Sequence, residues 1–111
     1  MISIVGLGNA ASAIAELFAD IKQYKVYKLN SSVSKNNKYE FKLKNYDVPE
    51  EYEQNIPNVE KFFKDSSDYI QFFVMGGSFS SNYTLGILEQ IKDKKIDLIY
   101  IQPDTELLTG Y

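Results

Sequence analysis

The sequence "YIQFFVMGGSFSSNYTLGILEQI" (69–91) joins a strongly apolar run to an amphipathic pattern through two glycines and several small polar residues. The apolar run at 69–74 predicts a buried strand, and the spacing of the apolar residues from 83 onward predicts a helix. The passage from strand to helix has two interpretations. Either the glycines only make a tight turn, or they let the backbone approach a phosphate group closely.

Further apolar runs predict more strands on either side of this stretch. Buried strands are predicted at 2–5 and 96–101, and a strand that alternates in part is predicted at 24–29. The segment "KYEFKLKNY" (38–46) alternates apolar and charged residues, so it predicts a strand with one wet face at the edge of a sheet. The segment 69–74 is the best candidate for a central strand.

Helices are predicted between these strands. The segment 11–23 has apolar residues at helical spacing, namely Ala13, Ile14, Leu17, Phe18 and Ile21. After an irregular acidic connection, a short helix begins near Pro57, with Val59, Phe62 and Phe63 on its buried side. Asp104 is a predicted N-cap. This alternation predicts a single domain (1–111) with a Rossmann-like three-layer α/β fold: a mostly parallel sheet of about four to five strands, with helices on both faces.

Composition excludes several classes of function. The chain has no Cys and no His, and all of its basic residues are Lys, so thiolate metal sites, imidazole chemistry and bidentate Arg clamps are excluded. A net charge of −3 argues against binding to nucleic acid. No apolar run is long enough to span a membrane, and the N-terminus lacks the basic region of a signal peptide. We therefore expect a cytoplasmic protein.

A second glycine loop follows the first predicted strand. The segment "GLGNAA" (6–11) matches the pattern G-x-G-x-x-A, a loose form of the dinucleotide fingerprint. Because the carboxyl ends of parallel strands meet at one edge of a sheet, this loop and the loop 76–82 are expected to lie together. The free N–H groups of a helix N-terminus at such an edge favour an anion.

The end of the second strand tests a dinucleotide interpretation. A dinucleotide-binding domain usually places Asp or Glu there, but this chain has Asn30. Asn30 therefore argues against NAD but is compatible with NADP, whose 2′-phosphate would lie near Lys35. In that alternative Gly6, Gly8 and Ala11 of the first loop also line the cofactor site. An NADP-binding domain of a truncated reductase therefore remains one alternative.

The segment "MGGSFSSN" (75–82), the helix pattern after it and "IDLIYIQPD" (96–104) resemble the N-terminal half of the tubulin/FtsZ family. In that family a strand ends in a loop of pattern GGGTGTG or GGGTGSG, and a helix and a strand ending near a proline follow. On this resemblance, "VGLGNAASA" (5–13) is the first glycine loop, Asn30 closes the second strand, and Pro103 is that proline. The nucleotide-binding residues it implies are Gly6, Gly8, Asn9, Ala10, Ser12, Asn30, Gly76, Gly77, Ser78, Phe79, Ser80, Ser81 and Asn82.

The resemblance implies binding of GTP or GDP, with Mg²⁺ brought by the nucleotide, and self-association into filaments or oligomers as in cytoskeletal proteins. It implies no catalytic residue and no metal ligand in this chain, since the family's hydrolytic carboxylates correspond to positions beyond 111. GTPase activity is therefore not expected of this chain alone. Ser80 and Asn82 stand where the family has glycine, and Phe79 where it has threonine. These departures leave a third alternative, a nucleotide-free structural or assembly module.

Overall fold

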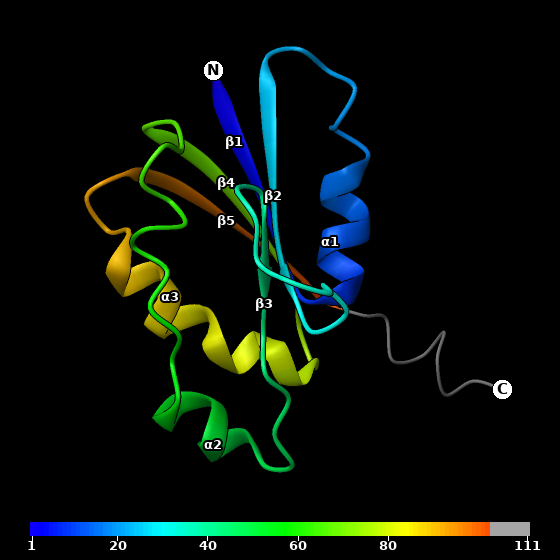
Figure 1. The fold of residues 1–111 in the computed structure, drawn as a ribbon, viewed down its shortest axis with the longest axis vertical. Helices are drawn as coiled ribbons and strands as arrows, with labels where there is room; N and C mark the ends of the chain where they lie inside the picture. The colour runs from blue at the N-terminus through cyan, green and yellow to red at the C-terminus, as the bar shows by residue number, and fades with distance from the viewer. Residues whose placement is uncertain (103–111) are drawn as a thin grey trace, which may run out of the picture.

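The computed structural model describes residues 1–102, so the predicted N-cap at Asp104 lies outside the described residues. Five strands form one parallel sheet in the order β3-β2-β1-β4-β5 (Figure 1). The strands are β1 (Ile2–Leu7), β2 (Tyr24–Asn30), β3 (Glu40–Lys42), β4 (Tyr69–Met75) and β5 (Lys95–Ile101). Every pairing in the sheet is parallel, so all five carboxyl ends lie at the same edge.

Helices cover both faces of the sheet, which confirms the predicted α/β fold class. Helix α1 (Asn9–Glu16) lies on one face, and α2 (Pro49–Gln54) and α3 (Thr84–Gln90) lie on the other (Figure 1). A 3-10 helix (Phe79–Tyr83) precedes α3 directly. The chain therefore forms the three layers that an all-parallel sheet needs, because both of its faces carry apolar side chains.

Two apolar clusters separate the layers, because successive side chains of a strand point to opposite faces. Beneath α1, Ile4 and Phe73 pack with Ala11 and Ala15 of the helix. The larger cluster fills the other face and is rich in aromatic residues. Its fully buried large side chains include Val5, Leu7, Tyr27, Leu29, Tyr52, Phe63, Ile70, Phe72, Tyr83 and Ile87.

The prediction of a helix that begins near Pro57 is wrong. The segment from 57 to 65 is irregular and turn-like, and the helix of this region is α2, within the stretch that was predicted to be irregular. Pro49 lies at the start of α2 and Glu50 and Glu51 occupy its first turn, positions that these residue types favour. The Gln90 side chain accepts a hydrogen bond from the Val59 N–H (2.7 Å) and donates one to the Pro57 carbonyl (2.8 Å).

The first helix is shorter than predicted, and its buried residues are not the apolar residues that the sequence pattern indicated. Helix α1 ends at Glu16, and turns follow it up to β2. Its buried residues are Ala11, Ser12 and Ala15, whereas Leu17 is 78% exposed. Small side chains therefore face the sheet, which lets the helix lie close to β1.

The two edges of the sheet differ from each other. Strand β3 is an edge strand, as predicted, but it is only three residues long. Among the described residues, strand β5 is the other edge, which corrects the prediction of a buried strand at 96–101: Leu98 is 45% and Tyr100 52% exposed. Strand β4 lies inside the sheet between β1 and β5 and is largely buried, as predicted for the segment 69–74.

Candidate functional site

The two glycine loops meet at the carboxyl edge of the sheet, which confirms that they lie together. Gly8 follows β1 and Ser80 follows β4, and a Cβ atom on Gly8 would overlap the Ser80 hydroxyl. Gly8 has φ +91°, a conformation that only glycine adopts without strain. The contact therefore depends on glycine for two reasons, the space and the backbone angle.

A cavity of about 520 Å³ opens at this contact. Its walls come from the connections after β1, β2, β3 and β4, which are brought together only by the parallel sheet. The residues that line it are Gly8, Asn9, Ala10, Ser31, Leu43, Lys44, Asn45, Tyr46, Ser78, Phe79 and Ser80. We call it the carboxyl-edge cavity.

One wall of the carboxyl-edge cavity is suited to an anion. Asn9 and Ala10 form the start of α1, and within residues 1–102 no side chain caps the first N–H groups of this helix. Lys44 is the one cation among the described residues that line the cavity. Unpaired N–H groups, the positive end of the helix dipole and an ammonium group together favour a phosphate or carboxylate.

The serines of the second loop differ in what they can offer. Ser78 donates its hydroxyl to the Met75 carbonyl (2.7 Å), and Ser81 donates to the Ser78 carbonyl (2.6 Å). These local bonds hold the turn that leads into the 3-10 helix. Among residues 1–102, Ser80 makes no such bond; it lines the cavity, with its hydroxyl next to Gly8.

Several predicted site residues have structural roles outside the carboxyl-edge cavity. The Gly76 N–H donates to Ile101 (2.7 Å), and a Cβ on Gly76 would lie 2.6 Å from the Tyr100 ring. Gly77 has φ +82° and open space around it. The Asn82 side chain donates to the Phe79 carbonyl (2.9 Å), and Ser81 also does not line the cavity.

Gly6 and Ser12 position the first helix. A Cβ on Gly6 would lie 2.6 Å from the Ala11 carbonyl oxygen, so glycine lets α1 pack tightly against β1. Ser12 donates to the Gly6 carbonyl (3.3 Å) at the same contact. Gly6 therefore supports the site through the placement of α1.

Asn30 and Ser12 line an adjacent cavity of about 360 Å³, which shares Asn9 with the first. The Asn30 side-chain oxygen accepts hydrogen bonds from the Val33 N–H (3.0 Å) and the Ser32 hydroxyl (3.1 Å), so it holds the turn after β2. Glu16 and Glu40 contribute carboxylates to this cavity. Lys35, which an NADP site would use, is not among its lining residues.

The wall after β3 was missed by sequence reasoning. Lys44, Asn45 and Tyr46 line the carboxyl-edge cavity, but the sequence pattern assigned them to an edge strand that in fact ends at Lys42. Their only sequence signal is their place at the end of the alternating segment 38–46.

Buried tyrosines hold this wall in place. The Tyr52 hydroxyl accepts a hydrogen bond from the Tyr46 N–H (3.0 Å) and donates to the Tyr46 carbonyl (3.3 Å). The Tyr83 hydroxyl donates to the Lys44 carbonyl (2.8 Å). The Tyr52 ring lies edge-on to Tyr83 at 4.9 Å and next to Phe79 at 6.0 Å, so one aromatic cluster joins α2, the 3-10 helix and the cavity wall.

The ionisation of Tyr83 gives a prediction about pH. Burial, with the neighbouring Tyr46 and Tyr52, raises the pKa of Tyr83 from 10.0 to about 12. The folded chain therefore keeps a proton that the unfolded chain releases above pH 10, so this stabilisation is complete below pH 10 and is lost as the pH rises toward 12. We expect the free energy of unfolding, measured by chemical denaturation, to fall over this range. The free energy of unfolding of Y83F should fall less steeply over this range. An equal slope in Y83F would contradict the assignment of this pH dependence to Tyr83. The control is Y24F, at a partly exposed tyrosine of β2 that lies outside this aromatic cluster.

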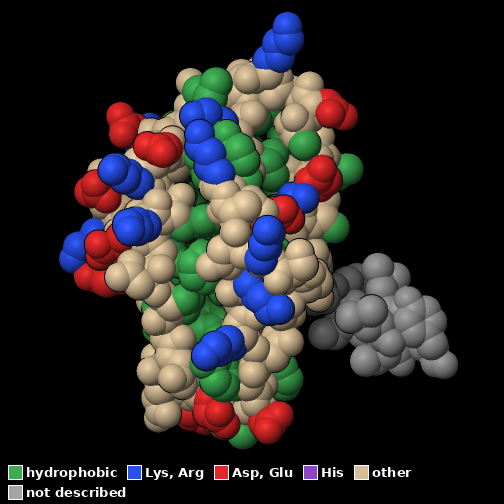
Figure 2. All heavy atoms as spheres, viewed as in Figure 1, with side chains coloured by type: hydrophobic (Ala, Val, Ile, Leu, Met, Phe, Trp, Pro, Cys, Tyr) green, Lys and Arg blue, Asp and Glu red, His purple; other side chains and the backbone are tan. Residues whose placement is uncertain are grey.

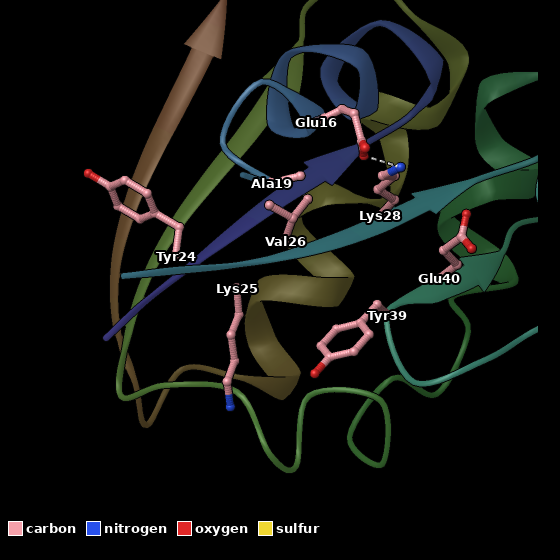
Figure 3. Close-up of a pocket in the computed structure, with 8 residues that line it drawn as sticks. All are labelled: Glu16, Ala19, Tyr24, Lys25, Val26, Lys28, Tyr39 and Glu40. Atoms are coloured by element: carbon pink, nitrogen blue, oxygen red, sulfur yellow. Dashed lines mark ion pairs between the residues drawn. The ribbon is translucent and has the colours of Figure 1, made fainter. Parts of the chain in front are cut away.

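A third cavity lies along β2, on the side of the chain that Figure 3 shows. It has about 340 Å³ and contains none of the predicted site residues. An ion pair between Glu16 and Lys28 crosses one side of it and ties α1 to β2 (Figure 3). Because Lys28 is already paired, we expect it to contribute little to the binding of an anion.

Residues 1–102 carry charges of both signs, and they form neither a cluster of potential metal ligands nor a helix that could span a membrane. Lysine and acidic side chains are interspersed on the face seen in Figure 2, with apolar side chains between them. The described residues contain no group of three or more potential metal-ligating side chains. No helix in this part of the chain is long and apolar enough to cross a membrane.

Comparisons of the chain with protein-family models, with curated proteins and with solved structures gave no match.

Proposed function

We propose that the carboxyl-edge cavity binds a purine nucleotide, GTP or GDP. The observation that supports this most is the meeting of the two glycine loops with the uncapped start of α1 and with Lys44 around one cavity of about 520 Å³. The preference for guanine nucleotides rests on the resemblance of the loop 75–82 and its flanking segments to the tubulin/FtsZ family.

Each part of the cavity has a role in this proposal. The N–H groups of Asn9 and Ala10, the Ser80 hydroxyl and the Lys44 ammonium hold the phosphates. The exposed ring of Phe79 and the ring of Tyr46 offer apolar surfaces for the base. The described lining includes no carboxylate, so Mg²⁺ comes with the nucleotide and no side chain of this lining is suited to act as a general base.

The adjacent cavity favours a nucleotide without a 2′-phosphate. Glu16 and Glu40 line it, and Lys28 already pairs with Glu16. A 2′-phosphate in this cavity would meet these carboxylates with no free cation among its described lining residues, and like charges repel. NADP is therefore the weaker candidate.

Thermal unfolding with added ligands tests the proposal. Saturating GTP or GDP with Mg²⁺ should raise the melting temperature more than NADP does, because a ligand that binds only the folded state stabilises it. K44A should weaken nucleotide binding roughly tenfold, because one charge-assisted hydrogen bond is lost. Isothermal titration measures this change directly.

The matched control is K42A, which removes a lysine at the end of β3 that does not line the cavity. It should bind nucleotide as wild type does. A larger thermal shift with NADP would support the reductase alternative. Absence of any nucleotide binding by wild type at millimolar concentration would overturn the proposal in favour of an assembly module.

A further inference from the structure

Strand β5 leaves one of its edges unpaired within residues 1–102. On the β4 side, the Lys95 N–H donates to the Asp68 backbone carbonyl (2.8 Å), and the Ile101 carbonyl accepts from the Gly76 N–H (2.7 Å). In a parallel ladder the bonding direction alternates along the strand, so the odd-numbered residues of β5 face β4. The N–H and C=O groups of Ile96, Leu98 and Tyr100 therefore point outward.

The outward-bonding residues of this edge carry none of the charges that usually prevent pairing, and the charged residues of β5, Lys95 and Asp97, have their backbone groups turned toward β4. The opposite edge strand, β3, is three residues long and includes Glu40 and Lys42. Strand β5 has seven residues, and its outward-bonding residues are all apolar or aromatic. Leu98 and Tyr100 are about half exposed. A long apolar edge of this kind is a template for another strand.

We propose that β5 pairs with β5 of a second copy of this chain, antiparallel, around a two-fold axis at Leu98. In this register Leu98 lies opposite its own counterpart, and Ile96 lies opposite the partner subunit's Tyr100. Each outward-facing residue then exchanges both backbone hydrogen bonds with its opposite. The exposed side chains of Leu98 and Tyr100 are covered by equivalent side chains from the other copy, and the two sheets become one continuous sheet.

The side chains of β5 favour this register over the two adjacent ones. An axis at Asp97 would place two carboxylates opposite each other, and like charges directly opposite destabilise a sheet. An axis at Ile99 would place Ile96 opposite the partner subunit's Gln102. Only the axis at Leu98 pairs every outward apolar residue with another. Such an interface is self-complementary, as closed two-fold dimers require.

Sedimentation of the full chain over about a hundredfold range of concentration tests the proposal, since dimerisation depends on concentration. Wild type should form dimers. L98K and L98E should each dimerise at least about tenfold more weakly, because like charges meet at the axis. An equimolar mixture of L98K and L98E should form a heterodimer, which tests the register itself. L17K, at an exposed residue after α1, is the control and should dimerise as wild type does.

Amide hydrogen exchange gives a second measurement. The N–H groups of Ile96, Leu98 and Tyr100 should be protected in wild type and exposed in L98K, whereas that of Ile99, which faces β4, should be protected in both. A wild type that stays monomeric at its highest concentration would overturn the proposal. The register would be overturned if L98K dimerised as wild type does, or if the equimolar mixture of L98K and L98E formed no heterodimer. Neither result bears on nucleotide binding, which is measured separately.

Discussion

G8V is expected to abolish nucleotide binding by the carboxyl-edge cavity. Gly8 has φ +91°, and a side chain on it would overlap the Ser80 hydroxyl, so valine would both strain the backbone and separate the two loops. The start of α1 would move with it, since the Gly8 N–H donates to the Leu29 carbonyl (2.7 Å) and its carbonyl accepts from the Ser12 N–H (2.9 Å). Titration calorimetry with GTP and GDP measures the loss.

G77V is the matched control for this change. Gly77 also has positive φ, +82°, but a Cβ there would meet no atom within 4 Å. Both variants should lose roughly 1–3 kcal/mol of stability through backbone strain. Only G8V should lose affinity. Equal loss of binding in the two variants would mean that the backbone at Gly77 also contacts the phosphates, as the resemblance implied.

Y52A is expected to cost the largest amount of stability, about 3–5 kcal/mol from its ring alone. Tyr52 is only 1% exposed and lies at the centre of the aromatic cluster that joins α2 to the 3-10 helix. Its loss also leaves the Tyr46 N–H without its partner. The total free energy of unfolding of a domain of this size is about 5–15 kcal/mol, so the variant should be close to unfolding at room temperature. Urea denaturation measures the change.

Y52F separates packing from hydrogen bonding. The ring remains, so the expected loss is about 1–3 kcal/mol, from an unsatisfied backbone N–H. Because Tyr46 lines the cavity, Y52F should also weaken nucleotide binding while the chain stays folded. Unchanged stability in Y52F would show that the Tyr46 backbone finds another partner and that the Tyr52 hydroxyl does not position the cavity wall.

The strands were predictable because their signal is local. Residues 2–5 and 69–74 are mostly apolar, residues 24–29 alternate in part, and the structure contains strands at all three. Position within the sheet was less predictable. The segment 96–101 is as apolar as an inner strand, but it lies at an edge, and composition alone does not distinguish the two.

The helix predicted near Pro57 does not form, for a non-local reason. Val59 and Phe63 are buried, as the pattern indicated, but the Gln90 side chain supplies hydrogen bonds to the backbone at 57 and 59. Gln90 is distant in sequence, so no window around Pro57 contains this information. The same applies to Lys44, Asn45 and Tyr46, whose place in the cavity depends on tyrosines of α2 and the 3-10 helix.

The central position of β1 affects how the chain folds during synthesis. Strand β1 is made first, yet one of its two neighbours is β4, which begins at Tyr69. At about 5–20 residues per second, a ribosome needs on the order of several seconds to add the intervening residues. Throughout that interval the side of β1 that faces β4 has no partner, and its apolar residues are open to wrong pairing. We therefore expect early folding to depend on what shields this side of β1 until β4 has been made.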